Sequence, residues 1–97
     1  MKEKSNLVIK YSVRFQKLRK LATQEIKISF RETLELFVEN PQHPQLRNHA
    51  LRGRYAGYRS IDITGDWRAV FQTRVTETQE IVTFQFLGTH EQLYGKN

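Results

Sequence analysis

The second half of the chain alternates hydrophobic and polar residues in short runs that turn signals separate. Residues 57–63 and 67–73 alternate in this way, and the Thr-Gly-Asp sequence at 64–66 between them is a turn signal. Residues 81–87 form a third run, which ends at Gly88. A period of two places alternate side chains on opposite faces of a strand, so the sequence predicts three successive antiparallel strands.

The first half has a different pattern. Residues 7–11 combine β-branched and aromatic types, which predicts a short first strand. Ser12 and Thr23 are good helix N-caps, and each precedes hydrophobic residues at helical spacing. We therefore expect two helices, the first of them basic and the second ending at Asn40-Pro41.

These elements add up to an α+β fold in the order β-α-α-β-β-β. Residues 46–51 are polar enough to be a loop or an edge segment. The expected architecture is a twisted antiparallel sheet packed on one side by the two N-terminal helices. With 97 residues, the chain is expected to form a single domain over residues 1–97.

Several classes of function lack support in the sequence. The chain has no cysteine, which excludes disulfides, a thiolate nucleophile and a cysteine-based zinc site. No apolar run approaches the roughly 18 residues of a membrane span, so a cytoplasmic protein without membrane contact is expected. Neither a metal-binding spacing nor a glycine-rich phosphate loop is present, and we expect no metal and no cofactor.

The charge of the chain is strongly positive. It has 16 Lys and Arg against 10 Asp and Glu, a net charge of +6, which attracts nucleic acids or acidic proteins. The excess lies in residues 1–20 and 46–74, and every basic residue of the second block is an arginine, whose planar group binds phosphate through two nitrogens. Charge alone is equally typical of an ordinary solvated surface.

The histidines suggest a chemistry for this charge. RNA can be cut without a metal because the 2′-OH beside each phosphate is a nucleophile. Cleavage then needs a base for that proton, an acid for the departing 5′ oxygen, and cations for the phosphate charge. Histidine fits both proton-transfer roles. His43, between two prolines, is expected to be an exposed loop residue, whereas His49 precedes the arginine block and His90 follows the last strand.

Four short motifs, taken together, resemble a known family. They are HALRG at 49–53, GYR at 57–59, DW at 66–67 and GTHEQLY at 88–94. The combination is similar to the RelE/ParE toxin superfamily, closest to its YafQ branch, and the resemblance spans almost the whole chain. It implies a RelE-like fold and a toxin of a type II toxin-antitoxin system, acting as a ribosome-dependent, metal-independent endoribonuclease that cleaves mRNA by 2′-OH attack.

The resemblance also implies partners. Proteins of this kind resemble small bacterial ribonucleases that enter the ribosomal A site and cut the mRNA there. A cognate antitoxin holds them inactive, with a toxin-antitoxin heterotetramer as the implied assembly. The expected partners are therefore an antitoxin, the ribosome and mRNA.

Site residues follow from the same resemblance. His49, Asp66 and His90 match positions that the family uses in cleavage, and Tyr94 matches an aromatic residue near the scissile nucleotide. His90 is the leading candidate for the general acid, and His49 would act as base or orient the substrate, with the assignment left open. Arg68 looks like the strand arginine that steadies the transition-state phosphate in the RelE branch. The other predicted RNA-binding residues are Arg52, Arg54 and Arg59.

One position departs from the YafQ pattern. Asp62 stands where that branch has a further histidine, and a carboxylate there could accept a proton, orient a histidine or repel the phosphate. Asp66 is also an ordinary turn residue, and Trp67 is expected in the core. Two other functions remain open: a ParE-like, non-catalytic inhibitor of DNA gyrase, and an inactive relative that only binds nucleic acid.

Overall fold

Five strands form one mixed sheet in the computed structural model, which describes residues 6–95. The strand order is β1-β5-β4-β3-β2. The strands are β1 (Asn6–Tyr11), β2 (His49–Ala50), β3 (Arg59–Asp62), β4 (Trp67–Val75) and β5 (Gln79–Thr89). The pairs β2-β3, β3-β4 and β4-β5 are antiparallel, and the last two were predicted from the alternating runs.

The prediction of a purely antiparallel sheet was wrong at β1. This strand pairs parallel with β5, from Asn6 opposite Gln79 to Tyr11 opposite Phe84. The chain leaves β1 through two helices rather than through a tight turn, and a helical connection allows the next strands to run in either direction. The prediction of β1 rested on the residue types of a run of five, and so short a run does not indicate the direction of its partner strand.

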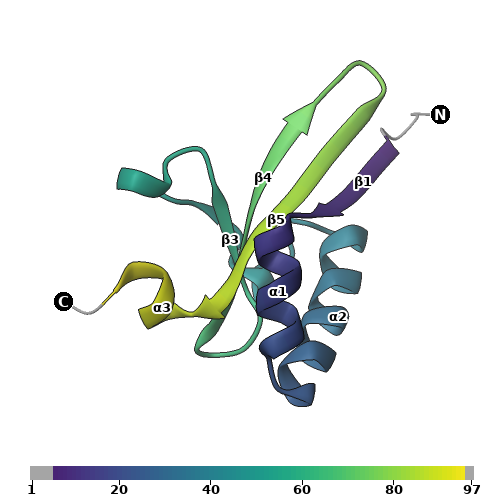
Figure 1. Cartoon of the computed structure of the whole chain (residues 1–97). Helices are drawn as coiled ribbons and strands as arrows, with labels where there is room; N and C mark the ends of the chain where they lie inside the picture. Colours follow the sequence, from purple (N-terminus) through teal and green to yellow (C-terminus); the bar gives the residue numbers. More distant parts are fainter. Residues whose placement is uncertain (1–5, 96–97) are drawn as a thin grey trace.

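The two predicted helices are confirmed, with the predicted caps. They are α1 (Val13–Leu21) and α2 (Gln24–Glu39). The Ser12 hydroxyl accepts a hydrogen bond from the Phe15 amide, and the Thr23 hydroxyl accepts one from the Ile26 amide. Both helices pack on one face of the sheet (Figure 1). The core between these layers is rich in phenylalanine, with neighbouring rings of Phe15, Phe30, Phe37, Phe71 and Phe84 5.2–6.0 Å apart.

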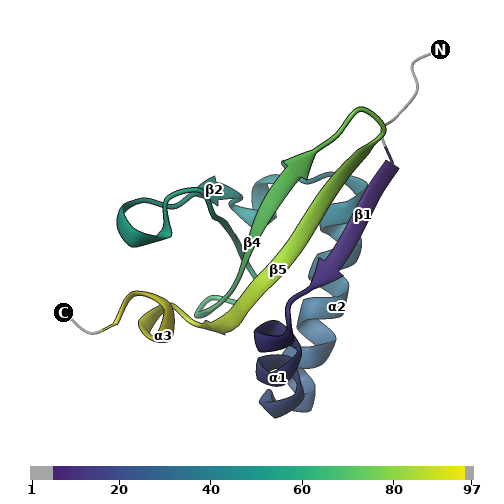
Figure 2. The ribbon, with the colours of Figure 1, turned by 45° about the horizontal axis from the view of Figure 1, so that its top comes forward.

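The opposite face of the sheet, which we call the far face, carries a second and smaller cluster. Its buried members are Leu51, Val70, Phe86 and Leu93. The loop of residues 51–58, which contains the short helix η2 (Gly53–Tyr55), and the C-terminal helix α3 (His90–Tyr94) supply its cover. In Figures 1 and 2 this loop and α3 project from the same side of the molecule, away from α1 and α2.

Helix α3 was not predicted, because its sequence was interpreted as a polar end. It begins with a capping box: the Thr89 hydroxyl accepts from the Gln92 amide, and the Gln92 side chain accepts from the Thr89 amide. The Thr-x-x-Gln spacing was the available signal. Strands β4 and β5 are also longer than predicted, since the expected turn over residues 74–80 occupies only residues 76–78.

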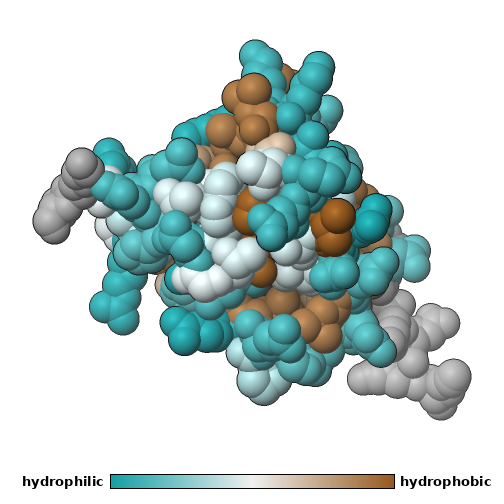
Figure 3. Space-filling model, turned by 90° about the horizontal axis from the view of Figure 1, so that it is seen from below, coloured by the Kyte–Doolittle hydropathy of each residue, from teal (hydrophilic) through white to brown (hydrophobic). Residues whose placement is uncertain are grey.

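Large hydrophobic side chains that remain exposed are scattered over the described residues. They are Val13, Leu21, Ile28, Val38, Val75 and Tyr94. Seen from below, the surface is mostly hydrophilic with separate hydrophobic patches (Figure 3). Within residues 6–95, no helix has the length and hydrophobicity needed to cross a membrane.

Candidate functional site

Asp62 holds two arginines from different parts of the chain. It lies at the end of β3, opposite Arg68 of β4. Its Oδ1 atom is 3.1 Å from Arg68 Nε, and its Oδ2 atom is 3.1 Å from Arg47 Nε. Side-chain exposure is 17% for Asp62 and 12% for Arg68 but 72% for Arg47. The carboxylate is therefore charge-compensated on both oxygens and leaves the group with a net positive charge.

Arg68 also organises the turn between β3 and β4. Its Nη1 atom donates to the backbone carbonyls of Thr64, Gly65 and Trp67 at 3.1–3.2 Å. Within residues 6–95, its Nη2 atom donates no hydrogen bond. The guanidinium is thus rigidly held, with one nitrogen left for another ligand.

Helix α3 places two rings beside this network. The rings of His90 and Tyr94 lie one helical turn apart, with centroids separated by 4.5 Å. The Tyr55 hydroxyl donates to the Leu93 carbonyl at 2.9 Å, and the Tyr55 ring meets Tyr94 edge-on at 6.4 Å. Helix α3 is therefore held by the loop of residues 51–58.

The ionisation of Tyr94 reflects the same surroundings. Although Tyr94 is 38% exposed, the partial burial of its ring raises its pKa above the ordinary value of 10.0; the positive charge of Arg68 partly opposes this rise, and Tyr55 adds to it. At neutral pH the hydroxyl stays protonated, so it can donate a hydrogen bond but cannot act as a base.

Asp66 lies in the turn that Arg68 holds. Its side chain is exposed, and its backbone carbonyl accepts a hydrogen bond at 2.8 Å from the His90 amide. Asp66 is thus connected to the site through its main chain, which fixes the start of α3 to the turn.

His49 lies on the far face as well, but not beside His90. It is exposed in the edge strand β2, opposite Ser60, and the same register continues to Val70 and Phe86. Three strand spacings separate His49 from β5, about 14 Å between backbones. The structure therefore does not bring the two histidine rings into contact. The Nδ1 atom of His49 lies 2.8 Å from the Arg47 carbonyl oxygen, and the tautomer that donates there leaves Nε2 as an acceptor.

The three remaining predicted arginines divide between the two faces. Arg52 and Arg54 are exposed in the loop of residues 51–58, on the far face with His90. Arg59 is opposite Phe71 on the helix-covered face, where its Nε donates to Asn48 Oδ1 at 2.8 Å. Strand alternation turns the side chain of Arg59 away from Asp62, and RNA binding by Arg59 stays a prediction.

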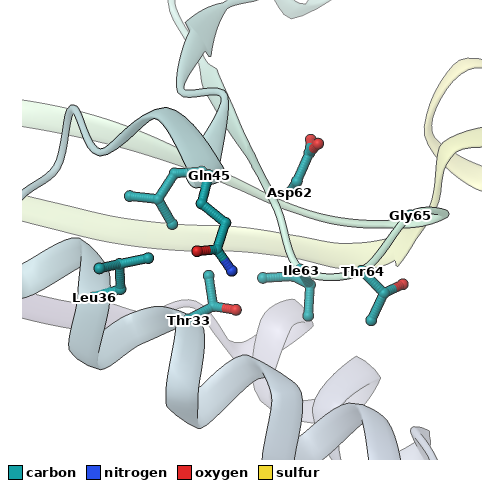
Figure 4. A pocket seen from close by; sticks show the side chains of 8 residues that line it. Thr33, Leu36, Gln45, Asp62, Ile63, Thr64 and Gly65 are labelled. Atoms are coloured by element: carbon teal, nitrogen blue, oxygen red, sulfur yellow. The ribbon is translucent and has the colours of Figure 1, made fainter.

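A cavity of about 280 Å³ opens on the other side of β3, between α2 and the short helix η1 (Pro44–Leu46). Uncharged side chains such as Thr33, Leu36 and Ile63 line it. Although Asp62 forms part of its wall, the carboxylate points away from Thr33 and Leu36 (Figure 4). This cavity is therefore separate from the charged site.

Arg47 and Tyr55 belong to the site, and sequence reasoning did not single them out as site residues. Arg47 has a φ of 49°, a left-handed conformation that is uncommon for a residue with a Cβ atom. No sequence pattern predicts this conformation. The only sequence feature that pointed to Arg47 was its position in the arginine-rich residues 46–74. Tyr55 is placed by its long-range bond to Leu93, which no local pattern encodes. Among residues 6–95, no group of three or more His, Asp or Glu side chains is arranged to hold a metal ion.

Similar proteins are known for almost the whole chain. Residues 7–95 match the family model of YafQ, a bacterial toxin of type II toxin-antitoxin systems. The mRNA interferase toxin YafQ of Escherichia coli K12 is 29% identical over 91 residues, which cover 90% of this chain and 95% of that protein.

Two solved structures extend this similarity to the fold. The crystal structure of YafQ from E. coli BL21(DE3) matches with a TM-score of 0.72 and 26% identity, over 90% of this chain and 97% of that chain. YafQ in the E. coli DinJ-YafQ complex matches with a TM-score of 0.65 and 28% identity, over the same shares of the two chains.

Proposed function

The chain belongs to the YafQ family of bacterial toxins of type II toxin-antitoxin systems, and from this premise we propose that it is an endoribonuclease that cleaves mRNA. The observation that carries the proposal is the pair of adjacent, tilted rings of His90 and Tyr94, beside the ion-paired Asp62 and Arg68 on one face. Together these residues offer a proton donor, a stacking surface and fixed positive charge at one place.

The reaction we propose is transfer of the phosphate to the neighbouring 2′ oxygen. The 2′-OH attacks the phosphorus, the bond to the 5′ oxygen breaks, and His90 protonates that oxygen as general acid. The products are a 2′,3′-cyclic phosphate and a 5′-OH end. His49 and Asp62 are the candidates for taking the 2′-OH proton; for His49, the separation across the strands requires the substrate to reach toward β2.

Charge on the phosphorane would be offset by the arginines. Arg68 is held in place and retains its Nη2 atom for an oxygen of the phosphate. Arg47 is anchored through Nε on Asp62, and its exposed side chain leaves the outer nitrogens facing solvent. A rigid donor costs little reorganisation when charge develops, which favours the transition state. Asp62 thus acts with the arginines instead of repelling the phosphate.

The partners follow from the family and from the charge. E. coli YafQ is known in a complex with DinJ, and we propose that a cognate antitoxin, with an acidic or amphipathic segment, covers the basic far face of this chain, in a heterotetramer. We further propose that the toxin acts in the cytoplasm, on mRNA in the ribosomal A site. A ribosome would supply the substrate orientation that so small a surface lacks.

A bacterial translation extract tests the proposal. The protein is added to a defined mRNA, and new 5′ ends are mapped with and without translation. Cuts that appear only during translation are expected for the wild type, with strong loss in His90→Ala and partial or strong loss in His49→Ala. His43→Asn is the matched control, because it removes a histidine from the loop after α2 and keeps an acceptor for the Gln45 amide.

Two results would contradict the proposal. If His90→Ala cuts as well as the wild type, the assigned acid is wrong. If the mRNA stays intact while the same preparation inhibits DNA supercoiling by gyrase, the ParE-like alternative replaces the nuclease.

A further inference from the structure

A small cavity of about 150 Å³ lies on the far face, apart from the residues proposed for catalysis. Its lining residues include Arg14, Arg54, Tyr55, Tyr58, Gln85 and Phe86. Pockets for drug-sized ligands are larger, roughly 300–1,000 Å³. The size therefore suits a single planar ring system better than a larger ligand.

The first wall is built where β5 extends beyond its pairing with β1. A β-bulge places Val70 opposite Phe86 and Phe71 opposite Phe84, which leaves Gln85 unpaired. Helix α1 covers this stretch because the Ser12 amide donates to the Phe84 carbonyl at 2.9 Å. The next turn then carries Arg14 over the Phe86 ring, 5.0 Å from its centroid.

The second wall comes from the loop of residues 51–58. The Tyr55 and Tyr58 rings meet edge-on with centroids 6.5 Å apart, and the Arg54 guanidinium lies 5.6 Å from the Tyr55 ring. Aromatic rings at the wall, guanidinium groups from two separate elements and a side-chain amide are the features that bind unpaired nucleobases with their phosphates.

The cavity is linked to the proposed catalytic residues through one side chain. Tyr55 lines the cavity and also contacts Tyr94 edge-on, and the Tyr94 ring in turn lies against the His90 ring at a tilt, with centroids 4.5 Å apart. A nucleotide in the cavity would therefore be a close neighbour of the nucleotide at His90.

We propose that this cavity binds one nucleobase of single-stranded RNA next to the cleaved linkage, with Gln85 reading the base edge and Arg14 contacting its phosphate. The proposal rests on the proposed RNA cleavage and adds a specificity subsite to it. Gln85 is suited to this role because its Nε2 is held by Gln72 Oε1 at 3.3 Å, which orients the amide and leaves its oxygen as an acceptor.

Nucleotide binding is the first test, and it does not depend on cleavage. Isotope-labelled His90→Ala protein is titrated with each of the four nucleoside 3′-monophosphates and followed by NMR. Shifts are expected at the Gln85 side-chain amide and at Arg14. Adding Arg14→Ala or Gln85→Ala should weaken binding of the preferred nucleotide about tenfold. Lys17→Ala, an exposed charge removed from the same helix, should leave it unchanged.

Cut-site mapping in the translation extract is the second test. Gln85→Ala is expected to alter which base flanks the cuts while cutting continues, and Lys17→Ala to keep the wild-type pattern.

An unchanged cut pattern in Gln85→Ala and Arg14→Ala, with no nucleotide shifts at the cavity, overturns the subsite while His90-dependent cleavage stands. If an acidic aromatic peptide, acetyl-Glu-Trp-Glu amide, shifts these signals and the nucleotides do not, the cavity binds protein and the subsite is overturned. Nucleotide shifts at the cavity in a protein that never cuts mRNA would support the subsite and overturn the proposed cleavage instead.

Discussion

The carboxylate of Asp62 forms ion pairs with two arginines that differ in exposure. Arg68 is nearly buried and has Asp62 as its counter-charge, whereas Arg47 lies mostly in water. A nearly buried charge that loses its partner destabilises the fold, while an exposed pair adds little. The stabilising part of this network is therefore the pair of Asp62 and Arg68.

Asp62→Asn is expected to lower the free energy of unfolding by about 2 kcal/mol, because Arg68 would keep its charge without compensation. Urea unfolding measures this change. Asp66→Asn is the control, since its exposed side chain should leave stability within about 0.5 kcal/mol of the wild type. Equal stability of Asp62→Asn and the wild type would show that the pair contributes nothing.

Tyr94 gives a prediction about pH. Burial raises its pKa above 10.0, so the folded state favours the neutral ring. Tyr94 should leave stability independent of pH below 10 and reduce it as the pH rises through its raised pKa. The ultraviolet absorbance of phenolate, compared between the wild type and Tyr94→Phe, isolates this ring. If the difference between the two proteins shows that Tyr94 ionises at or below pH 10, the argument that burial raises its pKa is wrong.

Among the elements, α3 matters most for the site because it carries His90 and Tyr94 on only five residues. Its start depends on tight packing at Gly88, where a Cβ atom would lie 2.6 Å from Gln92 Oε1 and 2.7 Å from the Phe86 ring. A helix this short has no stability of its own. The capping box and the bond from Tyr55 therefore hold it.

Thr89→Ala is expected to loosen α3, since it removes the hydroxyl that accepts from the Gln92 amide. Loss of such a cap costs about 1 kcal/mol, which corresponds to about fivefold faster hydrogen exchange at the amides of His90–Tyr94. NMR-detected exchange measures this effect, and Thr89→Ser, which keeps the acceptor, should exchange like the wild type. Unchanged exchange in Thr89→Ala would mean that packing alone holds the helix.

For the whole molecule, the distribution of charge decides how strongly RNA is attracted. The net charge is +6, and Arg52 and Arg54 are exposed on the far face with His90. Arg31 is also exposed, but on α2, which covers the other face. The strength with which the protein binds RNA phosphates should therefore depend on which arginine is removed.

Binding of inactive His90→Ala protein to single-stranded RNA is expected to weaken as salt rises. Each phosphate contact contributes about 0.7 to the slope of log affinity against log salt concentration. Removing Arg52 and Arg54 should reduce the slope by about 1.4, while Arg31→Ala should keep it. Fluorescence titrations at several salt concentrations measure the slopes. If the protein without Arg52 and Arg54, the Arg31→Ala protein and the parent protein all have the same slope, the RNA does not contact Arg52 or Arg54.

Much of the fold was predictable because its signals are local. Ser12 and Thr23 cap the two helices as predicted, and the alternation between Trp67 and Thr73 correctly predicted a strand. The motifs around His49 and His90 pointed to the correct family for the same reason, since residue types at fixed spacing can be compared directly. Tyr94 was also expected near the cleaved nucleotide; its ring lies tilted against that of His90, with centroids 4.5 Å apart, and its role in cleavage stays a prediction.

Other features depend on which distant segments come together, and these needed the folded chain. The direction of β1 and the separation of His49 from His90 both follow from strand pairing. The two arginines on Asp62 follow from it as well, combined with the left-handed turn at Arg47. Helix-capping and strand preferences act between residues a few positions apart, so they can be recognised in the sequence directly. Partners across a sheet are chosen by the packing of all the strands at once, and that choice exists only in three dimensions.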